Sequence, residues 1–425
     1  MEHKKGIPSS HFFRVNCPRI FLKKQAKILH LNASNSGGAY VFAENLIKGL
    51  QSESDFMNHH ACFTGSHNNV ALWPIKVLDK AHKFALHAQE KFKLLWHEKD
   101  ASVRFKFSMG DHGMPLKALK QLCEPFDIIH LHWINKGFIT LEDLASLNKP
   151  IVWTCHDAWP VTGGCHLPNT CKHFGSGCKQ CPLLKAPSEH DLSAQVFTRK
   201  SILYPHLNLS LISPSQFMHK QIEASALGHL SHNLCIPNGI ETERFKPSQA
   251  LLPSPFSIGF VAANLNDPNK SLHRLIEVLK HFPKDFNYRL ILVGQQKQAF
   301  EFELPPNTVL IQDANGAENM HKVYEQMHAL VCTSTVETYP TTLMEGFSNG
   351  VMGFGFEVGG VPEILNAMQR PAIKAFDTAA MANALMHYAS ALQNRFELHE
   401  NAQTVFDASQ TARAYAAKYA ELLNH

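Results

Sequence analysis

Apolar residues along this chain fall into short continuous runs that alternate with stretches of helical periodicity. Residues 26–32 form a first apolar run, and residues 39–51 then place Phe42, Leu46 and Leu50 four positions apart, which is typical of one helix face. The same alternation continues to residue 349. It predicts strands at 26–32, 59–64, 126–133, 150–157, 209–213, 256–263, 288–294, 308–313 and 328–334, and helices at 39–51, 140–147, 271–281, 318–327 and 340–349.

Buried strands that alternate with helices predict an α/β fold, in which helices cover both faces of a parallel sheet. Residues 236–255 interrupt the alternation with a high density of turn formers, including Pro237, Gly239 and Pro247. We therefore expect two Rossmann-like halves that face each other across a cleft, with ligands at the carboxyl ends of the strands. The expected divisions are a basic extension (1–25), an N-terminal domain (26–245), a C-terminal domain (255–405) and a helix that crosses back to the N-terminal domain (406–425).

Composition and charge narrow the function. The 425 residues contain 40 Lys and Arg against 36 Asp and Glu, and this mild net charge of +4 does not indicate a nucleic-acid partner. No apolar stretch is long enough for a membrane span, and no secretory signal is present, so we expect a cytoplasmic protein. Residues 76–106 are basic and contain Phe92 and Trp96. That segment is either a solvated helix face or a surface that contacts the inner membrane face.

Four of the ten cysteines form a compact cluster with the spacing C-x5-C-x6-C-x2-C. Four thiolates suit a closed, structural Zn²⁺ site, although free thiols and disulfides remain open alternatives. Cys155 and His156 do not form a nucleophilic dyad, because adjacent strand residues point to opposite faces. The cluster consists of Cys165, Cys171, Cys178 and Cys181.

Two carboxylates flank a predicted helix start in the second half of the chain. Glu337 lies in the loop after a strand, Pro340 suits the first helical position, and Glu345 lies about one turn into the helix. Unpaired amides at a helix start form an anion site. On spacing alone, a capped surface helix explains the pattern equally well. The amides in question belong to Thr341, Thr342 and Leu343.

The order of these motifs resembles the retaining GT-B glycosyltransferases of glycosyltransferase family 4. Glu337 and Glu345 match that family's E-x7-E motif, and residues 358–363 (VGGVPE) look like its GG-x-P-E loop. Upstream, residues 213–215 (SPS) and 236–240 (IPNGI) are similar to its domain-boundary signature. The run 153–160 (WTCHDAWP) resembles a subgroup that builds bacterial surface polysaccharide.

The resemblance implies a role for each matching residue. Glu337 contacts hydroxyls of the donor sugar, Glu345 accepts from the ribose hydroxyls, and Lys270 offsets the charge of the diphosphate. His156 lies beside the donor sugar. Without the resemblance, Lys270 reads as a solvated loop lysine and His156 as a satisfied core residue. The resemblance also places the following residues in donor binding: Gly37, Gly38, Asn264, Ser334, Thr341, Thr342 and Leu343.

The implied function is transfer of a sugar, with retention, from a UDP- or GDP-linked donor to a saccharide or lipid-linked acceptor in surface polysaccharide synthesis. The resemblance implies no catalytic metal, and the sequence has no Asp-x-Asp motif. A non-catalytic sugar- or nucleotide-binding descendant is the alternative, because Asn264 stands near the place of a usual arginine. A dinucleotide oxidoreductase is excluded, because the loop at Gly37 lacks the G-x-G-x-x-G spacing.

Overall fold

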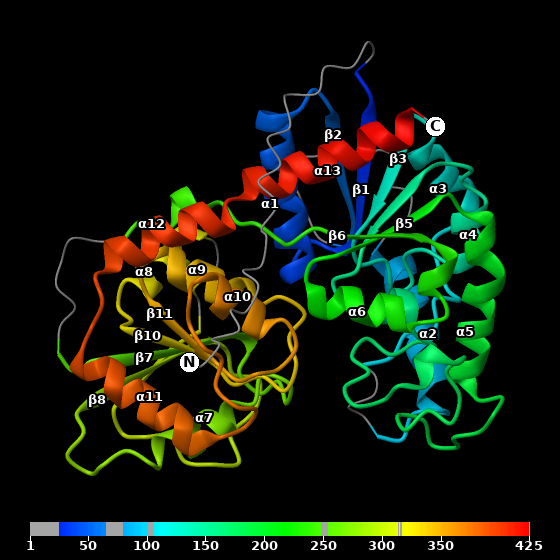
Figure 1. Ribbon diagram of the computed structural model, residues 1–425. Coiled ribbons are helices and arrows are strands. Elements are labelled where there is room, and N and C mark those ends of the chain that lie inside the picture. The colour runs from blue at the N-terminus through cyan, green and yellow to red at the C-terminus, as the bar shows by residue number, and fades with distance from the viewer. Residues whose placement is uncertain are drawn as a thin grey trace, which may run out of the picture.

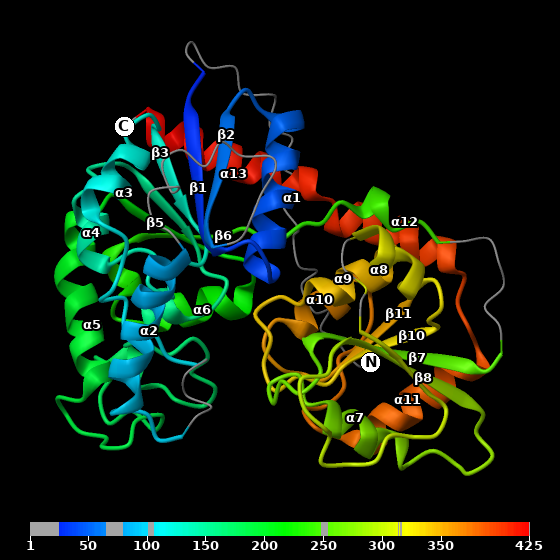
Figure 2. The ribbon, with the colours of Figure 1, turned by 180° about the vertical axis from the view of Figure 1, so that it is seen from behind.

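Two parallel sheets form the cores of two lobes (Figures 1 and 2). The computed structural model describes residues 25–64, 80–100, 106–247, 254–312, 314 and 317–424, so the basic N-terminal extension lies outside the described residues. The sheet of the first lobe has the strand order β2-β1-β3-β4-β5-β6. Its strands are β1 (Lys27–Ser34), β2 (Met57–Thr64), β3 (Ile128–Leu131), β4 (Ile151–Thr154), β5 (Leu209–Ser213) and β6 (His232–Cys235).

The sheet of the second lobe has the order β11-β10-β7-β8-β9, and every pairing in both sheets is parallel. Parallel strands are covered on both faces, which explains why all positions of β5 and β10 are buried. The predicted α/β class is therefore confirmed. The second sheet consists of β7 (Phe256–Asn264), β8 (Tyr288–Gln295), β9 (Thr308–Ile311), β10 (Ala329–Cys332) and β11 (Met352–Gly355).

Amphipathic helices pack on these sheets. In α7 (Leu272–Leu279), for example, Leu272, Leu275, Ile276 and Leu279 are buried at helical spacing. The α-helices that precede β7 are α1 (Gly38–Glu53), α2 (Lys80–Leu95), α3 (Leu116–Cys123), α4 (Leu141–Ala145), α5 (Leu192–Leu203) and α6 (Gln216–Ala224). The helices that follow α7 are α8 (Ala317–Tyr324), α9 (Thr341–Ser348), α10 (Val361–Ala367), α11 (Thr378–Ser390), α12 (Arg395–Phe406) and α13 (Ala408–Leu423).

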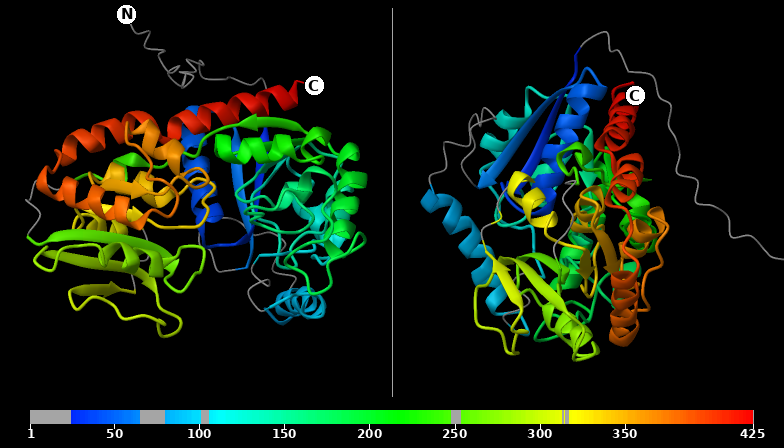
Figure 3. Two further views of the ribbon diagram at one scale, coloured as in Figure 1. Left: turned by 60° about the horizontal axis from the view of Figure 1, so that its bottom comes forward. Right: turned by 90° about the vertical axis from the view of Figure 1, so that its left-hand side faces the viewer.

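The C-terminal helix α13 packs on the first lobe, as Figure 3 shows. It lies so close to α1 that a Cβ at Gly49 would sit 2.9 Å from Cβ of Ala412. Tyr415 and Tyr419 are fully buried in one cluster with Phe42 of α1. The last helix of the chain therefore completes the core of the first domain.

The predicted helix at 406–425 corresponds to α13, which a break at Asp407 separates from α12. Asp407 has an extended backbone conformation, and its Oδ1 accepts the Ser409 amide at 2.8 Å. An aspartate at this position caps the start of α13, so the returning helix begins where the sequence pattern placed it.

A carboxylate joins the two lobes. Glu363 of α10 accepts the amides of Gln216 at 2.8 Å and Phe217 at 2.7 Å, which lie at the N-terminal end of α6. The positive end of a helix stabilises a carboxylate there. This contact fixes α10 of the second lobe against α6 of the first.

Candidate active site

The point where strand order reverses in the second sheet lies between β7 and β10. β8 and β9 follow on one side of β7, whereas β10 and β11 lie on its other side. In such sheets the loops after the two strands at the reversal form the ligand crevice. Here these loops are hydrogen-bonded to each other, since the Thr335 amide donates to the Asn269 carbonyl at 2.8 Å and the Thr333 hydroxyl donates to the Lys270 carbonyl at 3.1 Å.

Lys270 and Glu337 meet across this point. Nζ of Lys270 donates to Oε1 of Glu337 at 2.6 Å, and the Ser334 hydroxyl donates to the same oxygen at 2.6 Å. Burial acts to lower the pKa of Lys270, but the charge and hydrogen bond of Glu337, together with Cys332 and Asp267, outweigh it and raise that pKa. The lysine therefore stays charged, and 29% of its side chain remains exposed to solvent.

Two glycines, Gly359 and Gly360, lie against the backbone carbonyl of Glu337. Gly359 has φ +56°, and a Cβ at this position would lie 2.0 Å from the Glu337 carbonyl oxygen. The Gly360 amide donates to that same carbonyl at 2.8 Å. A side chain at Gly359 is thus incompatible with the present position of Glu337 on steric grounds.

The start of α9 lies beside the ion pair. One small cavity is lined by Lys270, Ser334, Glu337, Thr342 and Leu343 among others. The expectation that three amides are unpaired here is wrong for Leu343, whose amide donates to the Pro340 carbonyl at 3.2 Å. A tight first turn makes this bond, which leaves Thr341 and Thr342 as the candidate anion donors of α9.

Glu345 points from α9 toward α8. The Tyr324 hydroxyl donates to its Oε2 at 2.8 Å. Burial raises the pKa of Glu345 to about 7, although the tyrosine hydrogen bond acts in the opposite direction. A carboxylate at this pKa titrates near neutral pH, so its capacity to accept hydrogen bonds depends on pH.

Two further side chains, those of Asn264 and Arg274, hold the backbone near the ion pair. Asn264 ends β7, and its Oδ1 accepts the Asn266 amide at 3.1 Å, which shapes the loop that leads to Lys270. Arg274 belongs to none of the sequence motifs, because it lies inside the regular helix α7. Its Nη1 donates to the Thr333 carbonyl at 3.1 Å, so it fixes the end of β10.

In the first lobe the strand order reverses between β1 and β3. The loop after β1 carries Gly37 and Gly38, where α1 begins. Gly37 has φ +88°, and a Cβ at either glycine would meet no atom within 4 Å. The backbone at this helix start is therefore open to close approach by a ligand.

His156 follows β4 and forms the end of a chain of three imidazoles. Its Nε2 lies 3.1 Å from Nδ1 of His132, and Nε2 of His132 lies 3.1 Å from Nδ1 of His30. Nε2 of His30 donates to Oδ1 of Asn58 at 3.1 Å, which fixes the direction of every hydrogen bond in the chain. Burial lowers the pKa of His156 to about 4. The ring is neutral, and its Nδ1 is a hydrogen-bond acceptor.

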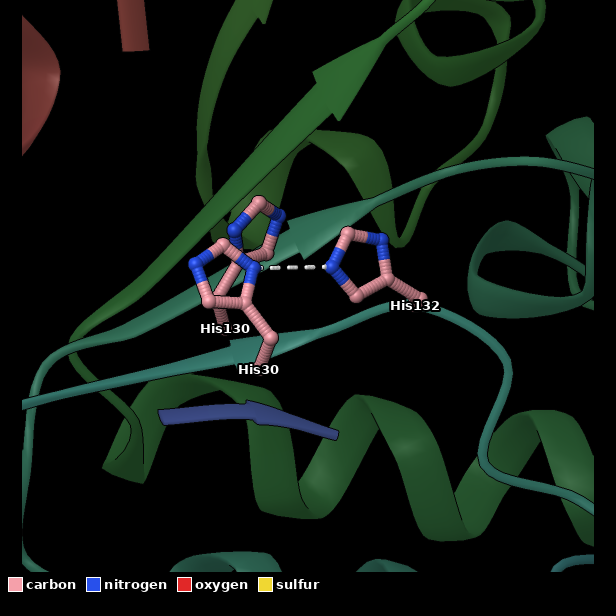
Figure 4. A group of neighbouring side chains, drawn as sticks. All are labelled: His30, His130 and His132. Atoms are coloured by element: carbon pink, nitrogen blue, oxygen red, sulfur yellow. Dashed lines mark hydrogen bonds between the residues drawn. The ribbon is translucent and has the colours of Figure 1, made fainter. Parts of the chain in front are cut away.

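His30, His130 and His132 lie together in the core of the first lobe, with ligand atoms within 4.8 Å of one another (Figure 4). Each of their six ring nitrogens already has a hydrogen-bond partner. Those of His130 face the hydroxyls of Tyr419, at 2.6 Å, and Thr154, at 2.8 Å. The three rings therefore form a polar network in the core rather than a vacant metal site. In the sequence, this network is indicated by polar residues two positions apart, His30 with Asn32 and His130 with His132.

Residues 244–405 match the family model of glycosyl transferases group 1. This match covers the C-terminal domain. The group 1 domain contains Lys270, Glu337 and Glu345, and it ends just before Asp407.

Relatives and solved structures extend the similarity beyond the group 1 domain. The putative colanic acid biosynthesis glycosyl transferase WcaC of Escherichia coli K12 is 28% identical over 246 residues, which are 53% of this chain and 57% of WcaC. The match therefore spans little more than half of that relative. Sucrose-phosphate synthase of Thermosynechococcus elongatus aligns with a TM-score of 0.65 at 14% identity and covers 94% of this chain and 100% of that one.

A third comparison concerns HepE of Anabaena, solved in complex with UDP and glucose. It aligns with a TM-score of 0.60 at 15% identity and covers 93% of this chain and 100% of its own. These alignments span both lobes. The chain has the GT-B fold, as the sequence motifs predicted.

Proposed function

We propose that this protein is a retaining glycosyltransferase that uses a nucleotide-sugar donor. The observation that carries the proposal is the Lys270–Glu337 pair, which lies at the strand reversal beside the start of α9. A cation and helix amides suit a diphosphate, and a carboxylate suits sugar hydroxyls. The group 1 family and the GT-B fold support this reading.

In the proposed mechanism, the acceptor hydroxyl attacks the anomeric carbon from the face that the diphosphate leaves. The bond from that carbon to the phosphate oxygen breaks, and the leaving oxygen takes the acceptor proton. Lys270 and the amides of Thr341 and Thr342 stabilise the charge that develops on the diphosphate, so we propose that no catalytic divalent metal is needed. Glu337 holds sugar hydroxyls, and Nδ1 of His156 accepts from another.

We propose a UDP- or GDP-linked donor and an acceptor in surface polysaccharide synthesis. The similarity to WcaC, whose name places it in colanic acid biosynthesis, supports the acceptor class. The fold shared with HepE, which was solved with UDP and glucose, supports a nucleotide-sugar donor.

A donor screen tests this function. Thermal unfolding is followed with UDP, GDP, dTDP and their sugar conjugates, because a ligand that binds the folded state raises the unfolding temperature. Hydrolysis of each stabilising nucleotide sugar is then measured. We expect stabilisation by one nucleotide class together with slow release of its sugar. Binding without any turnover would instead support a non-catalytic sugar-binding protein.

We further propose that the acceptor is lipid-linked and that α2 contacts an anionic membrane surface. Phe92 and Trp96 are 64% and 73% exposed at the end of α2, and their rings contact each other. Burial lowers the pKa of Lys136, and the nearby charges of Lys91 and, from the second lobe, Lys297 lower it further, so these three lysines lie close together. This concentration of positive charge beside exposed aromatics suits phosphate-bearing lipids. No helix in the described part of the chain is both long and apolar enough to cross a membrane.

The double substitution of Phe92 and Trp96 by alanine should weaken membrane binding by about tenfold or more, because each aromatic ring contributes roughly 1.5–3 kcal/mol when buried. Co-sedimentation with vesicles that contain phosphatidylglycerol measures the effect. Ile202→Ala is a matched control, since Ile202 is 61% exposed on α5. Equal sedimentation of the double variant and the wild type would refute the membrane contact at α2.

A further inference from the structure

The four clustered cysteines line one small cavity. It has a volume of about 20 Å³ and is bounded by Cys165, Cys171, Cys178 and Cys181 together with His173. None of the four forms a disulfide. A space of this size accommodates one atom-sized guest. Four thiols of one loop thus line the same small cavity.

The loop that carries these cysteines has little regular structure of its own. Between β4 and α5, the described chain contains two short 3-10 turns, Trp159–Val161 and His173–Gly175, and no α-helix or paired strand. A loop of this length without regular structure is uncommon within a compact domain, and the described part of this one is otherwise tied down by isolated β-bridges at Cys165 and Leu184. The loop begins directly after His156, so its order affects one wall of the proposed active site.

The backbone around the last two cysteines is shaped for a ligand. Cys178 and Gln180 both have positive φ, 44° and 51°, which is uncommon for residues other than glycine. The Gly163 amide donates to Sγ of Cys178 at 3.0 Å. Such a turn brings the two thiols of C-x2-C to the same cavity, and amide donors stabilise a sulfur that carries negative charge.

A buried lysine lies beside the cluster. Lys200 of α5 is fully buried, and its Nζ donates to the Trp159 carbonyl and, at 2.9 Å, to the Thr162 carbonyl. Burial lowers the pKa of Lys200 to about 7. Among the described residues, no carboxylate forms an ion pair with it. Asp157 acts on Lys200 without such a pair and is itself bound to His166 at 2.7 Å, and its other electrostatic neighbours are Cys178, Cys165 and Arg199.

We propose that Cys165, Cys171, Cys178 and Cys181 bind one structural Zn²⁺ ion as thiolates. Four sulfur ligands at about 2.3 Å are typical of closed zinc sites that have no open position for substrate. The resulting complex carries two negative charges, and Lys200 supplies a positive charge next to it. This accounts for a buried lysine that otherwise lacks a close counter-charge.

Binding requires the four sulfurs to move closer together. Among the described residues, ligand nitrogens of the three core histidines lie within 4.8 Å of one another, whereas no three of the four sulfurs do. We expect the loop to contract around the ion when it binds. The histidines do not compete for the ion, because their nitrogens are already hydrogen-bonded.

Metal content of the purified full-length protein tests the proposal. We expect one zinc per chain by elemental analysis, and stoichiometric release when a mercurial reagent modifies the thiols. Cys178→Ser and Cys181→Ser should lose the zinc and unfold at lower temperature. Cys123→Ser and Cys235→Ser are matched controls in other parts of the first lobe and should retain it.

If the variants fail to fold, measurements on the wild-type protein alone test whether the four cysteines bind zinc. Folded protein without zinc, whose unfolding temperature does not respond to added Zn²⁺, would overturn the proposal. A protein mass that shows disulfides among the four cysteines would also overturn the proposal. Elemental analysis that finds iron in place of zinc would do the same. None of these measurements depends on sugar transfer, so they separate the metal site from the proposed function.

Discussion

Replacing Lys270 with alanine should lower kcat by about 10²–10³-fold, because the variant leaves the charge on the departing diphosphate without its nearest cation. Donor hydrolysis, measured at saturating donor, reports the effect before the acceptor is known. The ion pair with Glu337 disappears in this variant, so thermal unfolding must be compared with the wild type to show that the domain remains folded.

Two further variants make the Lys270 test specific. Lys280→Ala removes an exposed lysine just after the C-terminal end of α7 and should leave kcat unchanged. Lys270→Arg keeps the charge in a different shape and should recover part of the lost rate. A wild-type kcat in Lys270→Ala would show that this lysine does not act on the leaving group.

Glu345→Gln should weaken nucleotide binding by roughly 10–100-fold, because a charge-assisted hydrogen bond to ribose contributes about 1.5–3 kcal/mol. In the wild type, affinity should also rise with pH. Burial raises the pKa of Glu345 to about 7, so the carboxylate that accepts the hydroxyls forms as pH increases through that value. Calorimetry with UDP or GDP between about pH 6 and pH 8 measures both effects.

The glutamine variant also serves as the pH control. The diphosphate of the ligand titrates in both proteins, so the contribution of Glu345 is the difference between their two pH profiles. Parallel profiles, or an unchanged dissociation constant in Glu345→Gln, would contradict the ribose role. Tyr324→Phe removes the hydroxyl that lowers the carboxyl pKa, so its binding transition should move to higher pH.

Hydrophobic patterning predicted much of the fold because buried parallel strands leave a strong signal. The runs at 209–213 and 256–263 coincide closely with β5 and β7. β6 was missed, since its four residues alternate in exposure at the sheet edge. β11 was missed because Gly353 and Gly355 obscure its apolar character. Edge strands carry less buried surface, so their sequences are less constrained.

Contacts between distant residues explain most of what the sequence could not predict. The motif resemblance identified Glu337 and Glu345, but not that Ser334 and Lys270 share one oxygen of Glu337. The histidine network joins β1, β3 and the segment after β4, so no local pattern shows it. The hydrogen bond of the Leu343 amide depends on the tightness of one helical turn, which varies too finely for a motif to specify.

The contact between Glu363 and α6 links the site to the relative position of the lobes. Gly360 binds the backbone of Glu337, and Glu363, three residues later, binds the start of α6 in the other lobe. Any shift of the Glu337 loop when a sugar enters must strain or release that contact. Occupancy of the second lobe is therefore coupled to how widely the two lobes separate, through the four residues from Gly360 to Glu363.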